Sequence, residues 1–365
     1  MKIDDVLQGD SLEMLKTLPD NSVDCCVTSP PYYGLRDYGT GIWVGGDPDC
    51  PHRRMSKYSD KIITGHIQEE LIGMVGDGIY KSVCPLCGAI REDKQIGLEN
   101  SPDEFVEKLV AVFHEVKRVL KDDGTLWLNI GDTYNGQKAG NTEVIKHKCV
   151  ADSNFFVKEK WRGAKQKDLI GIPWMLAFAL REDGWYLRQD IIWHKPNPMP
   201  EPVKDRCTKS HEYVFLMSKK PHYFFDYEAI QEDAVCTDDK RYGGDVSNIK
   251  ARGLRGQNAK AQQSFVAITD KRNKRDVWDV NTQAVREAHF ATMPEKLVEL
   301  CIMAGCRKGG IVLDPFFGSG TTGRVAIRKG RHYIGIELNK EYVEISKRRT
   351  SDIQLSLCGF LEDFK

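Results

Sequence analysis

Residues 311–323, IVLDPFFGSGTTG, decide the fold of this chain. An apolar run ends at Asp314, a glycine-rich turn follows, and the pattern predicts a helix directly after the turn. Gly318, Gly320 and Gly323 have the G-x-G-x-x-G spacing that lets a backbone approach a nucleotide closely. The turn is not a P-loop, because no Gly-Lys-Ser/Thr closes it. It predicts a nucleoside-type cofactor at the end of a buried strand.

The residues after this turn limit how the sheet can be built. The apolar run 333–336 predicts a strand that ends at Glu337, about 20 residues on, where an acid meets ribose hydroxyls. Only 42 residues follow the turn, 324–365, which is room for a helix, a strand and another helix. The strand that carries the turn must therefore pair with strands from the N-terminal half. We predict an α/β fold with a doubly wound, mostly parallel sheet in permuted order.

A second motif stands at the end of an early strand. The apolar run 23–27 predicts a short buried strand, and the pentapeptide TSPPY (28–32) follows it, where ligands bind in open α/β sheets. Its two prolines fix φ and leave carbonyls without a local partner. The stiff turn presents the Ser29 hydroxyl, carbonyl acceptors and the Tyr32 ring, which suits a planar group that carries an amine. For such a turn alone, an ordinary strand-to-loop corner is the alternative.

Together, DPFFGSGTTG and SPPY resemble the cofactor and catalytic motifs of the S-adenosylmethionine-dependent DNA amino-methyltransferases. Because SPPY comes first, the chain is similar to the circularly permuted β group of that family. The resemblance runs from about Val6 to about Arg349, with breaks at about 41–95 and about 230–275. It implies a Rossmann-like methyltransferase fold. It also implies methyl transfer from S-adenosylmethionine to the exocyclic amine of a flipped base in double-stranded DNA.

The resemblance implies roles for individual residues. Asp10 corresponds to the acid that contacts the adenine of the cofactor, although a capping or strand-end carboxylate explains it equally well. His289 precedes a helix that lies beside the methionine end of the cofactor. The implied catalytic residues are Ser29, Pro30, Pro31 and Tyr32. The other implied cofactor-binding residues are Asp314, Pro315, Phe316, Gly318, Ser319, Gly320, Thr321 and Glu337.

An exocyclic amine is a poor nucleophile because its lone pair is conjugated with the ring, and stacking blocks its approach inside a duplex. With the base flipped out, Tyr32 would stack on it. Ser29 Oγ and the Pro30 carbonyl would accept the amine protons and aim the lone pair at the methyl donor. A tuned base is then unnecessary, so His194 is not assigned that role. In the family, Ser at the first motif position is associated with cytosine N4 and Asp with adenine N6; Ser29 therefore favours cytosine and leaves adenine open.

Three other functions stay open on the sequence alone. A nicotinamide dehydrogenase would share the glycine motif but has no use for SPPY at a neighbouring strand end. A protein or RNA N-methyltransferase could use a similar prolyl turn, and a non-catalytic DNA-binding protein could keep the fold. No nuclease carboxylate cluster is evident, so any restriction-modification role implied by the resemblance concerns methylation and not cutting.

The segment at about 41–95 carries candidate metal ligands. Cys84 and Cys87 form a CxxC pair followed by glycine, which is typical of a zinc knuckle. Cys50 and His52 complete four ligands, with a C-x-H spacing tighter than usual. The segment has too few apolar residues to fold without a cross-link such as a bound metal ion. We predict a structural zinc; free buried thiols and a redox pair are the alternatives.

The segment 238–275 is basic, with ten Lys/Arg against four Asp/Glu. Such a stretch suits DNA reading, because Lys and Arg neutralise phosphates while Arg, Asn and Gln reach base edges. A solvated loop is the alternative. The stretch 134–168, with eight Lys/Arg against four Asp/Glu, is a second candidate to lie near DNA. The candidate base-reading residues are Arg252, Arg255, Gln257 and Asn258.

Composition limits the partners and the compartment. Acidic and basic residues are equal at 53 each, so the net charge of the protein does not attract nucleic acid. Any affinity for DNA must come from local basic patches. No apolar run approaches the roughly 18 residues of a transmembrane helix, and the N-terminus does not resemble a signal peptide. Eleven cysteines, several in predicted buried strands, fit a reducing compartment. We expect a cytoplasmic protein without a membrane partner; a homodimer stays open.

Local patterns also predict domains and element boundaries. We expect a helix from Ser11, as N-cap, to residue 18, and a long helix that starts after Ser101 and continues to Gly124. Segments 213–217 and 223–225 are expected at the antiparallel edge of the sheet. The expected domains are a catalytic half (1–40 and 96–230), a zinc-binding insert (41–95), a target-recognition segment (231–275) and a cofactor-binding half (276–365).

Overall fold

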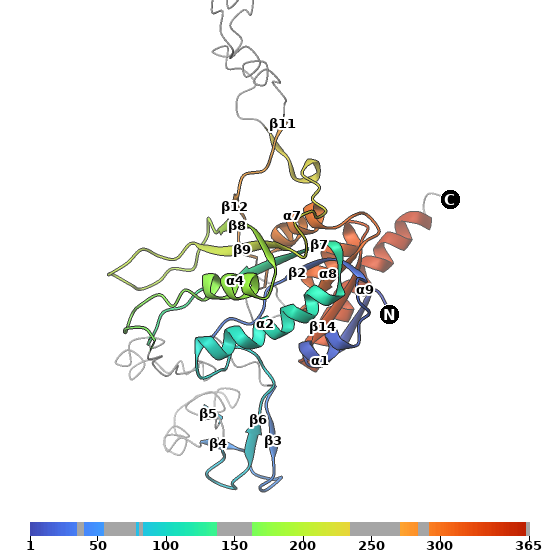
Figure 1. Cartoon of the computed structure of the whole chain (residues 1–365). Coiled ribbons are helices and arrows are strands. Elements are labelled where there is room, and N and C mark those ends of the chain that lie inside the picture. The colour runs from blue at the N-terminus through green and yellow to red at the C-terminus, as the bar shows by residue number, and fades with distance from the viewer. Residues whose placement is uncertain are drawn as a thin grey trace, which may run out of the picture.

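A computed structural model describes residues 1–34, 40–54, 78–79, 83–136, 163–233, 271–283 and 292–362. Within these residues, the main sheet has eight strands in the order β1-β14-β13-β2-β7-β9-β8-β12 (Figure 1). All neighbours are parallel except the pairs that involve β9. In sheet order the strands are Asp5–Gln8, His332–Glu337, Ile311–Asp314, Val23–Thr28, Leu120–Ile130, His211–Ser218, Tyr186–His194 and Val277–Asp279.

Helices cover both faces of this sheet. One buried cluster joins α1 (Ser11–Lys16), α2 (Pro102–Val119) and α4 (Ile172–Glu182) to the sheet. A second joins α7 (Glu295–Gly305), α8 (Thr321–Arg328) and α9 (Lys340–Glu362) to it. In β2, every residue is buried, and the neighbours Cys25 and Cys26 belong to opposite clusters. The predicted doubly wound α/β fold is confirmed.

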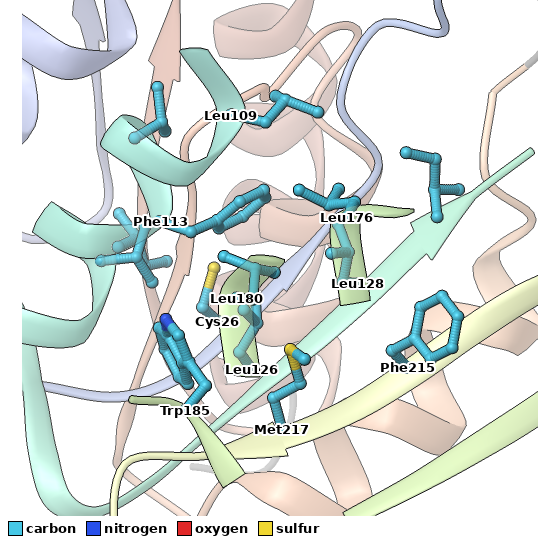
Figure 2. Packing of buried hydrophobic residues seen from close by; sticks show 14 of the residues in the cluster. Cys26, Leu109, Phe113, Leu126, Leu128, Leu176, Leu180, Trp185, Phe215 and Met217 are labelled. Carbon is cyan, nitrogen blue, oxygen red and sulfur yellow. The ribbon is translucent and has the colours of Figure 1, made fainter. Parts of the chain in front are cut away.

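Figure 2 shows the first of these clusters. Leu109 and Phe113 of α2 and Leu176 and Leu180 of α4 pack toward Leu126, whose strand lies at the middle of the sheet. These residues recur at the three- and four-residue spacing of one helix face, which the sequence of α2 predicts. The burial of these apolar side chains is the main force that holds the helices on the sheet.

The permuted connectivity is confirmed. Residues Val312 and Leu313 of β13 pair with Cys25 and Cys26 of β2. β14 pairs with β13 on one side and with β1 on the other. The strand that carries the glycine-rich turn therefore lies between a strand from the start of the chain and one from its end. The prediction that it must pair with the N-terminal half is correct.

Two boundary predictions and two placements are wrong. Asp10, not Ser11, is the N-cap of α1, and its Oδ1 accepts a hydrogen bond from the Glu13 N–H at 3.1 Å. α2 ends at Val119, because β7 starts at Leu120 and not after Gly124. β9 lies inside the sheet, antiparallel to both neighbours, while β12 and β1 form the edges. Segment 223–225 belongs to no strand.

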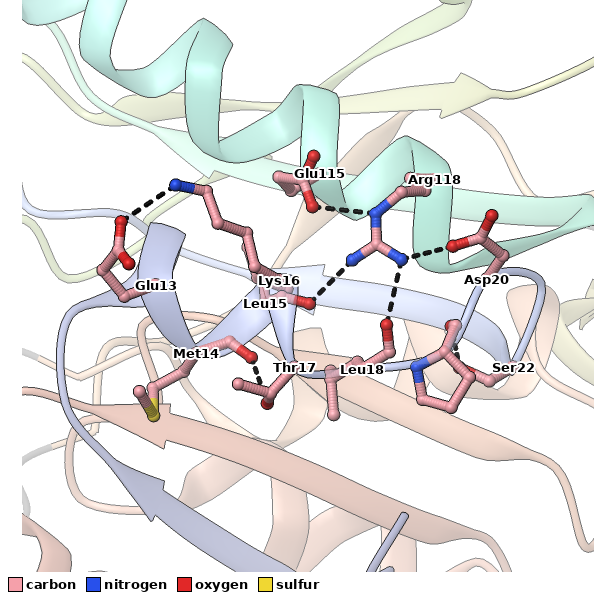
Figure 3. A network of polar contacts seen from close by, with 11 residues as sticks. Glu13, Met14, Leu15, Lys16, Thr17, Leu18, Asp20, Ser22, Glu115 and Arg118 are labelled. Atoms are coloured by element: carbon pink, nitrogen blue, oxygen red, sulfur yellow. Dashed lines mark hydrogen bonds and ion pairs between the residues drawn. The ribbon is translucent and has the colours of Figure 1, made fainter.

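A network of polar contacts fixes α1 on α2 (Figure 3). The Arg118 guanidinium donates to the carbonyls of Leu15, at 2.8 Å, and Leu18, at 2.9 Å, and forms ion pairs with Asp20 and Glu115. The Leu15 carbonyl also accepts from the Leu18 N–H at 3.0 Å, and Leu18 itself follows the end of α1, where the last carbonyls lack partners within the helix. One side chain of α2 thus caps α1.

The insert forms a small lobe beyond α2 (Figure 1). β3 (Ile42–Val44) pairs with β6 (Ile90–Glu92), and β4 (Arg53–Arg54) pairs with β5 (Gly78–Ile79). Within the described residues, none of these strands joins the main sheet. The helix η3 (Glu228–Ile230) and the pair β10 (Glu232–Asp233) and β11 (Lys271–Arg272) flank the predicted recognition segment. The domain boundaries stay predictions.

In the part of the chain that the structure covers, no helix is long and apolar enough to cross a bilayer.

Candidate functional site

The two sequence motifs meet at one cavity. The parallel strands β2, β7, β8, β13 and β14 all end at the same edge of the sheet, and β9, which runs the opposite way, begins there. The cavity at this edge has a volume of about 480 Å³. Its lining includes Ser29, Pro30, Pro31 and Tyr32 on one side and Asp10, Asp314, Pro315, Phe316, Gly318, Ser319, Thr321 and Glu337 on the other. The arrangement is the strand-end crevice expected of an open α/β sheet.

Asp314 connects the two motifs. Its Oδ1 accepts hydrogen bonds from Thr28 Oγ1, at 2.6 Å, and from the Phe316 N–H, at 3.0 Å. Its Oδ2 accepts one from Thr322 Oγ1 at 2.7 Å. Burial raises the pKa of this carboxyl to about 6, although the three donors act to lower it. A carboxylate that is buried and held by three donors has little freedom to move, so it fixes the relative position of both turns.

Glu337 lines the cavity beside the glycine-rich turn. Its Oε2 accepts a hydrogen bond from the Gly318 N–H and its Oε1 one from the Asn339 N–H, both at 2.8 Å. Burial raises the pKa of Glu337, and these two backbone donors partly offset the effect. Each carboxylate oxygen can accept a second hydrogen bond, so both oxygens can still take ribose hydroxyls.

The glycine-rich turn has the backbone that its sequence predicts. Gly318 and Gly320 have φ of 51° and 82°, in the left-handed region that other residues rarely adopt. Gly320 is the residue before α8 and does not line the cavity. Ser319 is held from behind, because Arg349 of α9 donates to its carbonyl at 2.7 Å and to its Oγ at 2.6 Å.

The SPPY turn is held by close backbone contacts. A Cβ on Gly131, the residue after β7, would lie 2.6 Å from Tyr32 Cε2, so the edge of the ring rests on this glycine. A Cβ on Gly97, where the chain returns from the insert, would lie 3.1 Å from the Tyr32 carbonyl oxygen. Neighbours on both sides therefore fix the position of Tyr32.

Several cavity residues were not found from the sequence. Tyr32 Oη donates to Glu212 Oε2 at 2.6 Å, and Lys195 forms an ion pair with the other oxygen of Glu212. Asn129 and Lys209 also line this side. Burial lowers the pKa of Lys209, and nearby Asp132 and Glu212 only partly offset this. All four lie at or near strand ends, but only the pairing of the strands shows that Glu212 and Asn129 lie beside Tyr32.

A metal-binding geometry exists in the insert. One ligand atom from each of Cys50, His52, Cys84 and Cys87 lies within 4.8 Å of the others. Cys50 Sγ is 3.7 Å from Cys84 Sγ, and Cys87 Sγ is 3.5 Å from His52 Nδ1. His52 has φ of 50°, a turn in the backbone at the tight C-x-H spacing. Trp43 stacks on its ring with centroids 4.4 Å apart.

Some residues that the sequence predicts to bind the cofactor or DNA lie outside the part of the chain that the structure describes. These are His289 and the four base-reading candidates Arg252, Arg255, Gln257 and Asn258, together with most of the stretch 134–168.

Comparison with known proteins finds relatives of the whole chain. Residues 23–348 match the family model of the N6/N4 DNA methylases. The chain is 42% identical over 344 residues to the type II methyltransferase M.Cfr9I of Citrobacter freundii, covering 94% of this chain and 86% of that protein. It is 40% identical to M.SmaI of Serratia marcescens, covering 94% and 89%.

Solved structures share the fold. The PvuII DNA methyltransferase, which is cytosine-N4-specific, superposes with a TM-score of 0.53 at 18% identity, over 94% of this chain and 85% of that one. The Thermus thermophilus protein TTHA0409, solved with S-adenosyl-L-methionine, gives 0.50 at 20% identity, over 95% and 93%.

Proposed function

Because this chain belongs to the N6/N4 DNA methylase family, we propose that it methylates the exocyclic amine of a flipped base in DNA, with cytosine N4 as the target. The chain is a DNA methyltransferase; the target atom and the roles of single residues are the proposal. One observation carries it: a single cavity of about 480 Å³ is lined both by the SPPY turn and by the glycine-rich turn with Glu337. A methyl donor and a base that accepts the methyl group would therefore lie side by side in this cavity.

The cofactor side of the cavity fits S-adenosylmethionine, which supplies an electrophilic methyl group when bound. Glu337 would accept hydrogen bonds from the ribose hydroxyls, and Asp10, although it caps α1, lines the cavity where the adenine would lie. Phe316 adds an apolar wall. TTHA0409, a relative in fold, was solved with this molecule. His289 stays a candidate for the methionine end.

The other side of the cavity fits a base. Ser29 Oγ and the Pro30 carbonyl would accept the two amine protons, and Tyr32 would stack on the ring. The amine nitrogen then forms its bond to the methyl carbon while the sulfur–carbon bond breaks, and one amine proton leaves to these acceptors or to water. Because that proton becomes acidic only as the bond forms, the site needs no strong base.

Ser29 supports cytosine N4 over adenine N6, because Ser at the first motif position is associated with cytosine N4 in the family. A hydroxyl can accept from the amine and donate to the adjacent ring nitrogen, which both bases have. The PvuII enzyme, which shares the fold, is cytosine-N4-specific. The basic segment 231–275, with Arg252, Arg255, Gln257 and Asn258, would read the recognition sequence in double-stranded DNA.

The decisive experiment is methylation of a random duplex library with labelled cofactor, followed by digestion and mass spectrometry of the nucleosides. We expect N4-methylcytosine. N6-methyladenine alone would move the target to adenine. 5-Methylcytosine would contradict the mechanism, since no cysteine among the described cavity residues is placed as the nucleophile that it requires. A Ser29→Ala variant, with the cofactor affinity of the wild type, should lose most of the activity.

The proposal includes a structural zinc at Cys50, His52, Cys84 and Cys87. A tetrahedral zinc with Zn–S of about 2.3 Å and Zn–N of about 2.1 Å separates its ligands by about 3.6–3.8 Å. The separations of 3.7 Å between Cys50 Sγ and Cys84 Sγ and of 3.5 Å between Cys87 Sγ and His52 Nδ1 fit this. Four protein ligands leave no position for water, so the ion would staple the insert and take no part in methyl transfer. A cytoplasmic location agrees with such thiol ligands.

A further inference from the structure

The Tyr32 ring is held at its hydroxyl as well as at its edge. The hydroxyl lies 2.6 Å from Glu212 Oε2 and 3.2 Å from Asn129 Oδ1. A phenol has one proton to donate, and the shorter distance assigns it to Glu212. At its edge, the ring rests on Gly131, where a methyl group would come within 2.6 Å of Cε2.

Glu212 is itself fixed from two sides. Its Oε1 forms the ion pair with Lys195, and its Oε2 accepts a second hydrogen bond from Asn129 Nδ2 at 3.2 Å. Asn129 is buried and also donates to the Tyr213 carbonyl at 3.2 Å. Lys195 lies over the Trp193 ring, 4.5 Å from its centroid. Both Glu212 and Lys195 are less than one-fifth exposed, so solvent competes weakly with these contacts.

Four separate segments supply this arrangement. Tyr32 follows β2, Asn129 is the last but one residue of β7, Lys195 follows β8 and Glu212 is the second residue of β9. The pairing of Trp193 with Glu212 across β8 and β9 puts the acid at the strand-end edge. The pairing of β9 with β8 therefore brings a carboxylate to the SPPY turn.

We propose that Glu212 is a positioning residue for the transfer reaction: held by Lys195 and Asn129, it fixes the Tyr32 ring in the orientation in which the flipped base stacks. This rests on the proposed function and deepens it. A ring that is fixed before the base arrives loses no freedom when the base binds, so the reacting nitrogen is held in line more often. Donation to a carboxylate also makes the ring more electron-rich, and the base becomes more positive as its amine is methylated, so the attraction grows in the transition state.

The test compares Tyr32→Phe, Glu212→Ala, Glu212→Gln and the double variant Tyr32→Phe/Glu212→Ala with the wild type. Single-turnover methylation of a duplex that carries the mapped site gives the rate, and calorimetry gives the affinity for S-adenosylmethionine. Tyr32→Phe and Glu212→Ala should each slow methylation about tenfold, the effect of one hydrogen bond to a charged group, with cofactor affinity unchanged. Glu212→Gln, which keeps an acceptor for the hydroxyl, should recover most of the rate.

The double variant tests whether Tyr32 and Glu212 affect the rate through their shared contact or independently of each other. Since both single changes remove the same contact, it should be no slower than the slower single variant. Independent, multiplying effects would overturn the proposal, as would single variants that methylate at the wild-type rate. The matched control is Glu228→Ala, because Glu228 accepts a 3.0 Å hydrogen bond from Tyr227 on the exposed surface, away from the cavity. Its rate should equal that of the wild type.

Two readouts do not depend on turnover. 2-Aminopurine at the target position should be quenched by stacking on Tyr32 in the wild type and brighter with Glu212→Ala. A thermal-unfolding cycle of the same proteins should show coupling between positions 32 and 212; no coupling would refute the contact. If Glu212→Ala does not fold, the methylation rates of Tyr32→Phe and Glu212→Gln are compared instead. A slow Tyr32→Phe beside a Glu212→Gln close to wild type supports the proposal, and equal rates overturn it. A wild-type protein that methylates no DNA would refute the proposed function instead.

Discussion

Thr28 Oγ1 donates a 2.6 Å hydrogen bond to Asp314 Oδ1, which joins two strand ends that lie 286 positions apart in the sequence. Both groups are buried, Asp314 at 3% exposed. One end opens the SPPY turn and the other opens the glycine-rich turn. This hydrogen bond, together with the backbone pairing of β2 with β13, therefore fixes the two turns relative to each other.

The burial of Asp314 gives the stability of the protein a defined pH dependence. The pKa of Asp314 is raised from 3.8 to about 6 by burial. The folded chain therefore keeps a proton that the unfolded chain releases. The stabilising contribution is complete below the unfolded pKa and is lost as pH rises through about 6. Urea unfolding between pH 4 and pH 8 should show wild type losing up to about 3 kcal/mol relative to Asp314→Asn. Parallel profiles for the two proteins would contradict the raised pKa.

Glu337 should control cofactor affinity. Glu337→Ala removes the acceptor for ribose hydroxyls and also leaves the Gly318 N–H without its partner, so the turn loosens. Calorimetry should show S-adenosylmethionine binding weakened at least about tenfold. The control is Glu341→Ala, an exposed acid at the start of α9. Equal affinities for the two variants would remove Glu337 from the cofactor site.

Zinc content should follow the four proposed ligands. Elemental analysis of protein prepared without chelator should find about one zinc per chain, and Cys84→Ser should lose it. Cys207→Ser is the matched control, because Cys207 is exposed and is not part of the cluster. Metal-free wild-type protein with an unchanged unfolding profile would show that the insert folds without the ion.

Arg118 should stabilise the fold without affecting catalysis. Arg118→Met removes the Arg118 donor from the Leu18 carbonyl and leaves the Leu15 carbonyl with only the Leu18 N–H, and it should lower the free energy of unfolding by about 1–3 kcal/mol. Lys16→Met, which breaks an exposed ion pair with Glu13 in the same network, should cost much less. Chemical denaturation measures both; equal losses would mean that the α1 carbonyls find other partners.

DNA affinity should fall steeply with salt despite the neutral net charge. Each phosphate contact contributes about −0.9 to the slope of log K against log salt concentration. Arg252→Gln with Arg255→Gln should make the slope shallower, whereas Lys347→Gln on α9 should not. Deletion of 240–275 should abolish sequence-specific methylation and leave cofactor binding intact. Retained specificity would place the reading element elsewhere.

Much of the fold follows from local patterns. The glycine-rich turn and the shortness of the chain after it required β13 to pair with an N-terminal strand, and it pairs with β2. The same patterns cannot give register between distant strands. An apolar run such as 213–217 indicates a strand but not its neighbours, so β9 was expected at the edge and is found inside the sheet.

The candidate site also contains residues that the sequence predicts and residues that only the structure reveals. Residues within a motif, such as Tyr32, Asp314 and Glu337, can be recognised because turn geometry and chemistry are local. Glu212 and Lys195 stand at strand ends in unremarkable surroundings, and only the pairing of β8 with β9 shows that they face Tyr32. Asp10 shows a further difficulty: one carboxylate caps α1 and also lines the cavity, so the two interpretations do not exclude each other.

The position of β13 beside β2 has a consequence during synthesis of the chain. β2 emerges from the ribosome early, but one of its two neighbours is encoded 286 positions later. At roughly 5–20 residues per second, that edge stays unpaired for roughly 15–60 s. A nascent chain therefore exposes an apolar strand that can pair with another chain, and aggregation or chaperone capture competes with folding in that interval. Slower translation of the second half should lower the yield of soluble enzyme more than slower translation of the first.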